Sequence, residues 1–179
     1  MPLPAPTSPA QPADALDYLL SADAIRQTKA RYCRYIDTKQ WDRLASIFTD
    51  DCRFEGLGSA PAGADVAMFV QGVSSRLAHT ISVHHCHMQE TVMTGPDTAR
   101  VIWAMEDFVE WTDGGTVKET PGSKGFFGYG HYEEEYRRVG TDWKISFLRL
   151  TRLRLDPVPV DAPAPRMGQR QATPDWLDV

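Results

Sequence analysis

The 179-residue sequence contains no apolar run that approaches the roughly 18 residues needed by a membrane-spanning helix. Its first residues are rich in proline and alanine and lack the basic start and apolar stretch of a secretory signal. Dense runs of Lys or Arg are also missing, and 24 acidic against 19 basic residues give a formal net charge of −5. Because phosphate groups are bound by positive surfaces, we expect neither nucleic acid nor a membrane as a partner.

Cysteine is scarce as well. Cys33, Cys52 and Cys86 are odd in number and show no CxxC spacing of the kind that binds metals. Disulfide frameworks belong to oxidising compartments and pair their cysteines, so this pattern favours a reducing compartment. The sequence therefore predicts a cytoplasmic protein with buried free thiols.

What is present is the composition of one globular domain, with 42% hydrophobic and 10% aromatic residues. Five prolines within residues 1–15 indicate a flexible arm, because proline removes a backbone donor and no hydrophobic pattern accompanies it. The predicted domain covers residues 16–156. A second proline-rich segment, residues 157–179, is expected to be a tail, in which Trp176 is either exposed or docked on a neighbouring surface.

Hydrophobic periodicity divides the predicted domain into a helical half and a β-rich half. Apolar residues recur at helical spacing in the first half, and long runs rich in β-formers separated by Gly- and Asp-containing turns fill the second. The predicted helices cover residues 21–37, 40–48 and 65–77, a short strand covers 52–54, and longer strands cover 80–94, 98–112, 125–139 and 143–155. This order predicts an α+β fold, in which helices cover one face of a four-stranded antiparallel meander.

A curved antiparallel sheet closed by N-terminal helices encloses a cone. Trp41, Trp103 and Tyr132 are expected to line its interior among other apolar groups. A largely apolar cavity with a few polar groups is the usual form of a small-molecule site. The sequence therefore predicts a pocket for a small hydrophobic substrate.

Asp37 is the first candidate polar group in that pocket. It closes the first predicted helix between Tyr32 and Trp41. A carboxylate among aromatic rings is desolvated, which is one way in which proteins tune an acid or a base. The competing interpretation is a surface Asp that caps the following helix.

Three of the five histidines fall in one predicted strand, as His84, His85 and His87. Strand alternation sends His84 to one face and the other two to the opposite face, and which face looks inward stays open. A His-x-His pair on a strand can bind a metal, but a third ligand is not evident from the sequence. An inward histidine also serves as a general base without metal, so we expect no metal and no cofactor.

Asp107 shares a strand face with Trp103 and Met105, so an acid interrupts an apolar stripe. Arg149 has the parity of the apolar residues that precede it on the last predicted strand and is expected to pair with Asp107 or with a substrate carboxylate. Arg152 has the opposite parity, and a bulge would exchange the two arginines. A solvent-exposed Asp107 at a strand end is the alternative.

Together these motifs resemble the SnoaL-like branch of the nuclear transport factor 2-like superfamily over residues 16–156. The matching segments are Y-x-x-x-x-D from Tyr32 to Asp37, W-D at 41–42, F-T-D-D at 48–51, V-H-H at 83–85, T-A-R-x-I-W-x-M-E-D at 98–107, G-H-Y at 130–132 and W-K-I at 143–145. The resemblance implies a cone-shaped α+β barrel, usually a dimer or trimer and often free of cofactors. The Asp37 and His84 positions match the Asp/His pair of scytalone dehydratase and bile acid 7α-dehydratase.

The resemblance further implies a cofactor-independent lyase, such as a dehydratase, or an isomerase acting on a steroid-like or polyketide-like substrate. His84 would be the base, Asp37 would orient it, and Tyr32 would donate a hydrogen bond to the reacting oxygen. Asp107 and Arg149 would position the substrate. The alternatives are a noncatalytic ligand-binding or assembly subunit, like the β subunits of ring-hydroxylating dioxygenases, and a polyketide cyclase. A homo-oligomer formed through the outer sheet face is expected in each case.

Overall fold

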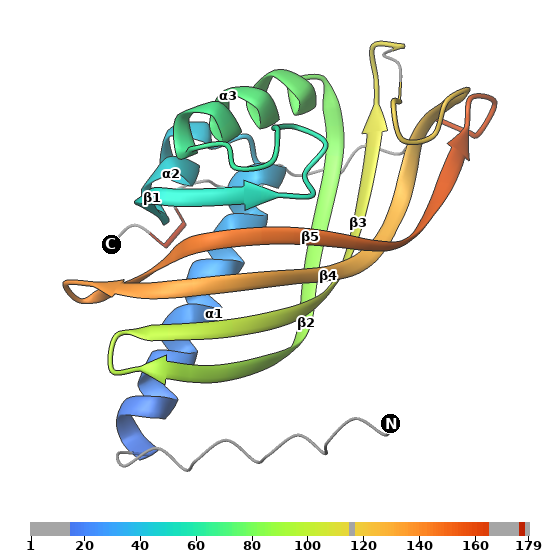
Figure 1. Ribbon diagram of the computed structural model, residues 1–179. Helices are drawn as coiled ribbons and strands as arrows, with labels where there is room; N and C mark the ends of the chain where they lie inside the picture. Colours follow the sequence, from blue (N-terminus) through green and yellow to red (C-terminus); the bar gives the residue numbers. More distant parts are fainter. Residues whose placement is uncertain (1–14, 115–116, 165–175, 178–179) are drawn as a thin grey trace.

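A computed structural model describes residues 15–114, 117–164 and 176–177 of the chain. Most of the expected arm and most of the expected tail lie outside these residues. Three helices, α1 (Ala15–Asp37), α2 (Trp41–Ser46) and α3 (Val66–Leu77), accompany one curved sheet (Figure 1). Its strands are β1 (Phe48–Glu55), β2 (Thr80–Gly95), β3 (Thr98–Trp111), β4 (Ser123–Val139) and β5 (Asp142–Pro159). The predicted α+β class with a curved sheet covered by N-terminal helices is confirmed, and the sheet is unclosed.

The sheet has five strands in the order β1-β5-β4-β3-β2, one more than the four that were predicted. The additional strand, β1, pairs in parallel with β5, and Phe54 lies opposite Leu148. Only residues 52–54 were expected to be extended there, and a pairing between segments almost a hundred residues apart leaves no local signal. Strands β2 to β5 form the predicted antiparallel meander.

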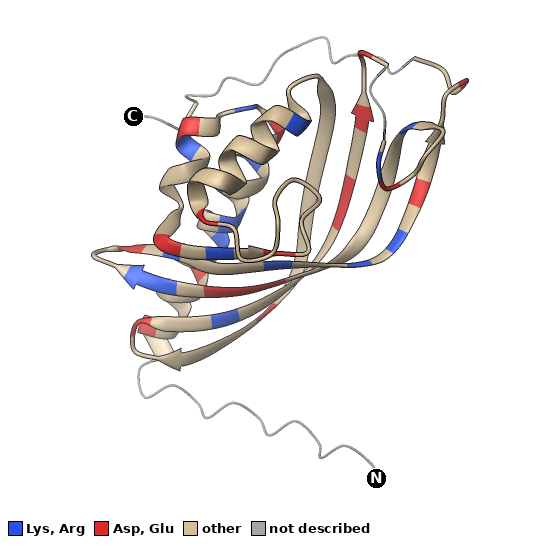
Figure 2. Ribbon diagram, turned by 45° about the horizontal axis from the view of Figure 1, so that its top comes forward, with Lys and Arg blue, Asp and Glu red and all other residues tan. Residues whose placement is uncertain are grey.

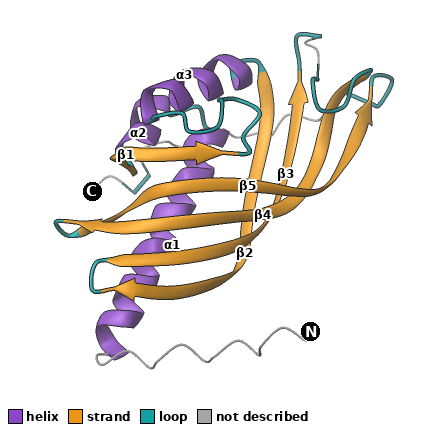
Figure 3. Cartoon of the chain, viewed as in Figure 1, coloured by secondary structure: helices purple, strands orange, loops and turns teal. Residues whose placement is uncertain are grey.

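The helices cover the concave face of the sheet, with α1 lying along it and α2 and α3 packing over one end (Figures 1 and 3). Helix α1 presents a buried stripe that includes Ile25, Tyr32 and Ile36. Helix α3 begins after Asp65, whose carboxylate accepts the backbone N–H of Met68 at 2.8 Å and so satisfies an otherwise free helical donor. Burial of these apolar stripes against the sheet holds the layers together.

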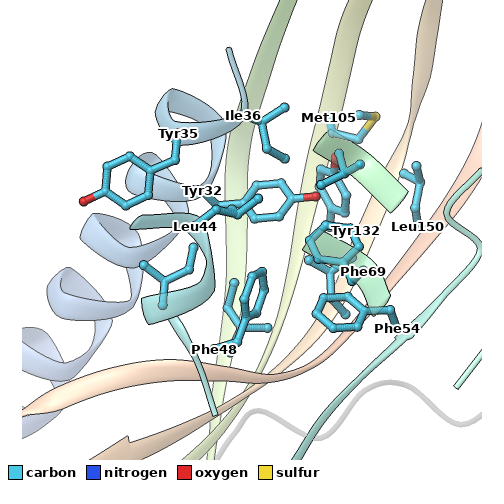
Figure 4. Close-up of a cluster of buried hydrophobic side chains, with 14 of the residues drawn as sticks. Tyr32, Tyr35, Ile36, Leu44, Phe48, Phe54, Phe69, Met105, Tyr132 and Leu150 are labelled. Carbon is cyan, nitrogen blue, oxygen red and sulfur yellow. The ribbon is translucent and has the colours of Figure 1, made fainter. Parts of the chain in front are cut away.

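An aromatic cluster fills the space between the helices and the sheet (Figure 4). The Phe54 ring of β1 stacks on the Phe69 ring of α3, with centroids 4.1 Å apart. The Tyr32 ring of α1 meets the Tyr132 ring of β4 edge to face at 5.7 Å. These contacts lock both helices to the sheet, because aromatic pairs add about 0.5–1.5 kcal/mol beyond their buried area.

Strand β5 contains a bulge that decides which of its side chains point inward. Ile145 lies opposite Tyr136, whereas Phe147 lies opposite Glu135, so Ser146 is an extra residue in the ladder. Inserting one residue exchanges the two faces of a strand. Consequently Trp143 and Ile145 are buried before the bulge, and Leu148 and Leu150 are buried after it.

Strand β5 also extends past residue 156, where the predicted domain ends. Val158 pairs with Gly125 and Pro159 with Ser123. Beyond its contact with β1, this end of β5 has only β4 as a neighbour, so proline, which lacks an N–H donor, fits an unpaired strand edge. Among the described residues, no helix is long and apolar enough to cross a membrane.

Charged residues are distributed along the strands and helices in both signs (Figure 2). Many of them form cross-strand ion pairs on the convex face, for example Arg100 with Glu135 and Arg149 with Glu133. This intermingling agrees with the absence of dense basic runs in the sequence.

Candidate active site

Asp37 and His84 are held in direct contact, at the C-terminal end of α1 and in β2. The ring Nδ1 of His84 lies 2.6 Å from Asp37 Oδ1, and the backbone N–H of His84 donates to Asp37 Oδ2 at 2.8 Å. The Ser82 hydroxyl donates to Asp37 Oδ1 at 3.0 Å. Three hydrogen bonds therefore fix the carboxylate, and the carboxylate fixes the orientation of the imidazole.

This arrangement determines where the reactive nitrogen of His84 lies. With Asp37 accepting the proton on Nδ1, the neutral imidazole carries its lone pair on Nε2. The Nε2 atom lies 3.9 Å from Asp107 Oδ2, and the ring lines a half-open cavity. The His84 side chain is only 7% exposed, so this nitrogen is poised toward the cavity rather than toward bulk water.

Lys39 supplies a positive charge behind the Asp37 carboxylate. It has a left-handed backbone conformation, with φ of 61°, in the turn after α1. Its ammonium group donates to Ser82 Oγ at 2.9 Å and to Thr80 Oγ1 at 3.3 Å. Burial lowers the pKa of Lys39, and attraction to Asp37 opposes this shift. Lys39 was not predictable from the sequence, because its position depends on a turn geometry unusual for lysine.

The buried carboxylate of Asp107 forms a two-pronged ion pair with Arg152. Arg152 Nη1 donates to Asp107 Oδ1 at 2.7 Å, and Nη2 donates to Oδ2 at 2.6 Å. Burial alone would lower the pKa of the Arg152 guanidinium, but the hydrogen bond and charge of Asp107 raise it. The Arg152 guanidinium therefore keeps its positive charge, and the pair lies beside the His84 ring through the Asp107 carboxylate.

Gly128 makes room for this ion pair. A methyl group at this position of β4 would lie 2.1 Å from Arg152 Nη1 and 2.2 Å from Asp107 Oδ1. Such separations are far below van der Waals contact, so a larger residue requires the ion pair to move. Gly128 is thus part of the site, although nothing in the sequence pattern distinguishes it from the other glycines of β4.

The cavity has a volume of about 330 Å³ and lies between the sheet, α3 and the loop after β1. Its polar groups are few: the His84 ring, the Asp107–Arg152 pair, the Tyr32 and Tyr132 hydroxyls, Ser59, and an ion pair between Arg76 and Glu119. The apolar lining comprises Ile36, Leu57, Phe69, Val73, Leu77, Val109, Trp111, Phe126, Leu150 and Leu155. The volume and lining suit one compact, largely apolar small molecule.

Tyr32 and Tyr132 both line the cavity, as their predicted roles require. Burial raises the pKa of the Tyr32 hydroxyl well above 10, although a hydrogen bond with Tyr132 opposes that shift. Burial likewise raises the pKa of Tyr132. Both phenols are therefore neutral at physiological pH and are able to donate a hydrogen bond.

The structure corrects the prediction that Arg149 faces the cavity. Arg149 is 43% exposed and pairs with Glu55 at 2.8 Å and Glu133 at 3.2 Å on the outer face. The bulge at Ser146 reverses the parity of β5, so Arg152 takes the inward position expected of Arg149.

Trp41 and Trp103 also lie outside this cavity. Trp41 is partly buried at the start of α2, with the Lys39 ammonium 5.8 Å from its ring centroid. Trp103 is buried beside a separate groove that Cys33 and Cys86 also line. Cys33, Cys52 and Cys86 are free thiols, and the sulfur atoms of Cys33 and Cys86 are 3.6 Å apart.

His85 and His87 point away from the cavity, on the outer face of β2, with exposed fractions of 56% and 50%. The alternation expected for this strand holds, and the structure places His84 on the inner face. Of the groups considered from the sequence, the structure thus brings together Tyr32, Asp37, His84, Asp107, Tyr132 and Arg152.

Comparisons with known proteins identify a family and a shared fold. The sequence matches the SnoaL-like domain family over residues 17–149. It is 30% identical over 143 residues to FGR4 of Gibberella zeae, a probable cyclase, and the match covers 74% of this chain and 91% of that protein.

Solved structures share the fold. A hexachlorocyclohexane dehydrochlorinase, LinA-type3 of Novosphingobium barchaimii, superposes with a TM-score of 0.67 at 22% identity, covering 86% of this chain and all of that one. A protein of Novosphingobium aromaticivorans described as a "Putative Scytalone Dehydratase" gives a TM-score of 0.67 at 18% identity, covering 84% of this chain and all of that one. At these identities the likeness concerns the fold alone.

Proposed function

Since the chain belongs to the SnoaL-like domain family, we propose that it is a cofactor-independent lyase or isomerase that acts by proton abstraction on a compact hydrophobic cyclic substrate. One observation carries the proposal: His84 turns Nε2 to an apolar cavity while Asp37 holds Nδ1 at 2.6 Å. A base so placed takes a proton from bound substrate, and its imidazolium form is stabilised by Asp37.

In the proposed dehydration, His84 Nε2 removes a proton from the carbon next to a carbonyl group. The electron pair of that C–H bond moves to the carbonyl oxygen and forms an enolate. The enolate then collapses, a carbon–carbon double bond forms, and the β-hydroxyl group leaves as water with the proton that His84 returns. The step is redox-neutral, and an isomerisation differs only in returning the proton to another carbon.

Arg152 and the tyrosine pair are the groups that would stabilise the enolate oxygen. The Arg152 guanidinium donates two N–H groups to Asp107, and Arg152 also lines the cavity. Tyr32 supplies a neutral hydroxyl donor in the same cavity. Donors fixed in an apolar site act strongly on developing charge, because they need no reorganisation during the reaction.

A cyclase activity is the second candidate, and the 30% identity to the probable cyclase FGR4 favours it. The same proton removal by His84 creates a carbon nucleophile, which attacks a second carbonyl of the same molecule instead of expelling a hydroxyl. The π electrons of that carbonyl move to its oxygen, which takes the proton back from His84. The residue roles are unchanged, so the shape of the substrate decides between elimination and ring closure.

The test uses two probes whose chemistry follows the structural relatives: scytalone, followed by loss of water, and hexachlorocyclohexane, followed by chloride release. We expect turnover of at least one probe and a fall in kcat of about 10²–10⁴-fold in His84→Gln. His131→Gln, the same replacement on the outer face of β4, is the matched control and is expected to keep full activity.

Two outcomes count against the proposal. Turnover that persists in His84→Gln would remove the proposed base. Saturable binding of the probes, seen as a raised melting temperature without turnover of either, would favour the noncatalytic ligand-binding role instead.

A further inference from the structure

His85, His87 and Glu106 form a cluster on the outer face of the sheet that the proposed reaction does not use. One side-chain ligand atom from each residue lies within 4.8 Å of the other two. We propose that these three residues bind a divalent transition-metal ion, for which zinc is the ion that best matches the ligands. The sequence-based expectation of no metal rested on the lack of a third ligand for the His-x-His pair, and the fold supplies that ligand from the neighbouring strand.

Sheet geometry explains why the three groups converge. His85 and His87 are two residues apart in β2, so both point to the same face. Glu106 lies directly opposite His85 in the β2–β3 ladder and therefore projects from that face as well. Backbone pairing fixes this arrangement, which does not depend on a loop.

The distances between ligand atoms fit a shared ion. Glu106 Oε1 lies 3.2 Å from His85 Nδ1 and 3.8 Å from His87 Nε2. Ligands at about 2.0–2.1 Å from a tetrahedral zinc are about 3.3 Å apart, so small side-chain rotations bring all three into coordination. Two imidazoles and one carboxylate are ligands that zinc accepts, and water takes the fourth position.

Electrostatics also favour a cation here. The Glu106 carboxylate contacts the two imidazoles, which coordinate metal in their neutral form. In the single chain all three side chains are about half exposed, which leaves the ion a path from solvent before any assembly through this face. Exposure of the ligands also keeps the cost of removing charge from water small.

The site lies on the backbone that carries the catalytic groups. His85 follows His84, and Glu106 precedes Asp107, so the ion would link β2 to β3 directly behind the active site. The ladder is irregular just beyond, between His87 and Glu90, where Met88 adopts a φ of 44°. An ion that binds only the folded chain stabilises it, and here it would brace the irregular segment.

The experiment is a calorimetric titration of the full chain, freed of metal by a chelator, with Zn²⁺. We expect one ion per chain and a higher melting temperature with zinc. His85→Gln and Glu106→Gln should each weaken binding at least about 10-fold, because changes in groups behind metal ligands already cost about 10–100-fold. Glu135→Gln, on the outer face of β4, is the matched control and should bind as the unchanged chain does.

A second titration with Co²⁺ identifies the ligands, because thiolate coordination adds an intense near-ultraviolet band that imidazole and carboxylate do not. This separates the proposed site from the Cys33 and Cys86 thiols, and Cys33→Ser should leave Zn²⁺ binding unchanged. The proposal is overturned if the unchanged chain shows no saturable binding, if binding persists in both His85→Gln and Glu106→Gln, or if the thiolate band appears. Because none of these readouts measures turnover, they do not depend on the proposed enzymatic function.

Discussion

The ammonium group of Lys29 lies 2.5 Å from a carboxylate oxygen of Glu134, and both side chains are almost completely shielded from solvent. The same carboxylate accepts the Tyr136 hydroxyl at 2.5 Å, and the Tyr132 ring centroid lies 3.4 Å from the Lys29 nitrogen. A charged pair thus links α1 to β4 inside the core. It can persist there only because each charge is neutralised and hydrogen-bonded.

Removal of one partner should therefore be costly. We expect Lys29→Met to lower the free energy of unfolding by about 3–5 kcal/mol, since it leaves the Glu134 carboxylate buried and unpaired. Urea denaturation gives this value. Arg100→Met, which removes a partner from the exposed pair with Glu135, is the control and should cost about 1 kcal/mol or less. Equal losses in the two variants would contradict this account of the core.

The same cluster predicts loss of stability at alkaline pH. Burial by itself lowers the pKa of Lys29, but Glu134, Cys86 and Cys33 together more than reverse this, so the pKa is raised above 10.5. A raised pKa means that the folded chain holds its proton more tightly, so this stabilisation is complete below the unfolded pKa and is lost as pH rises through the folded one. The pKa of Tyr136, raised by burial, acts in the same direction.

The urea midpoint should accordingly stay level from about pH 7 to about pH 9 and fall steeply above about pH 10. Lys29→Met removes one of the responsible groups, so its midpoint should fall less over the alkaline range than that of the unchanged chain. A urea midpoint that rises above about pH 10 would contradict the raised pKa values of Lys29 and Tyr136.

The site was predictable from sequence wherever local alternation or a motif decides a position. The parity of β2 separates His84 from His85, and the Tyr32–Asp37 spacing is one of the segments on which the resemblance to the family rests. Arg152 was misplaced because the bulge at Ser146 reverses the parity of β5, and a bulge of one residue leaves no hydrophobic signature. The parallel pairing of β1 and the burial of Lys29 against Glu134 depend on segments about a hundred residues apart, which local patterns do not report.

Gly128→Ala tests whether catalysis requires the Asp107–Arg152 ion pair to keep its position beside His84. The new methyl group would lie within 2.2 Å of atoms of both Asp107 and Arg152, so the pair must move from its position beside His84. We expect kcat to fall by about 10-fold or more, because small misplacements of groups around a reacting centre cost about that much or greater. In an Asp107→Asn background the same replacement should cost much less, since the two changes act on one pair. Additive losses would show that Gly128 acts elsewhere.

The last prediction concerns assembly through the outer face of the sheet. Val83, Ile102 and Phe127 are between 40% and 45% exposed there, and the Phe108 ring packs against Phe127 with centroids 4.9 Å apart. Apolar groups gathered on one face of a sheet usually mark an interface, and symmetry closes such contacts into dimers or trimers. Light scattering should therefore give a mass two or three times the 20.0 kDa of one chain.

A charge introduced by Phe127→Lys should shift the mass toward the monomer, whereas Leu16→Lys, at an exposed apolar residue of α1, should not. A monomeric mass for the unchanged chain at micromolar concentration would refute the assembly.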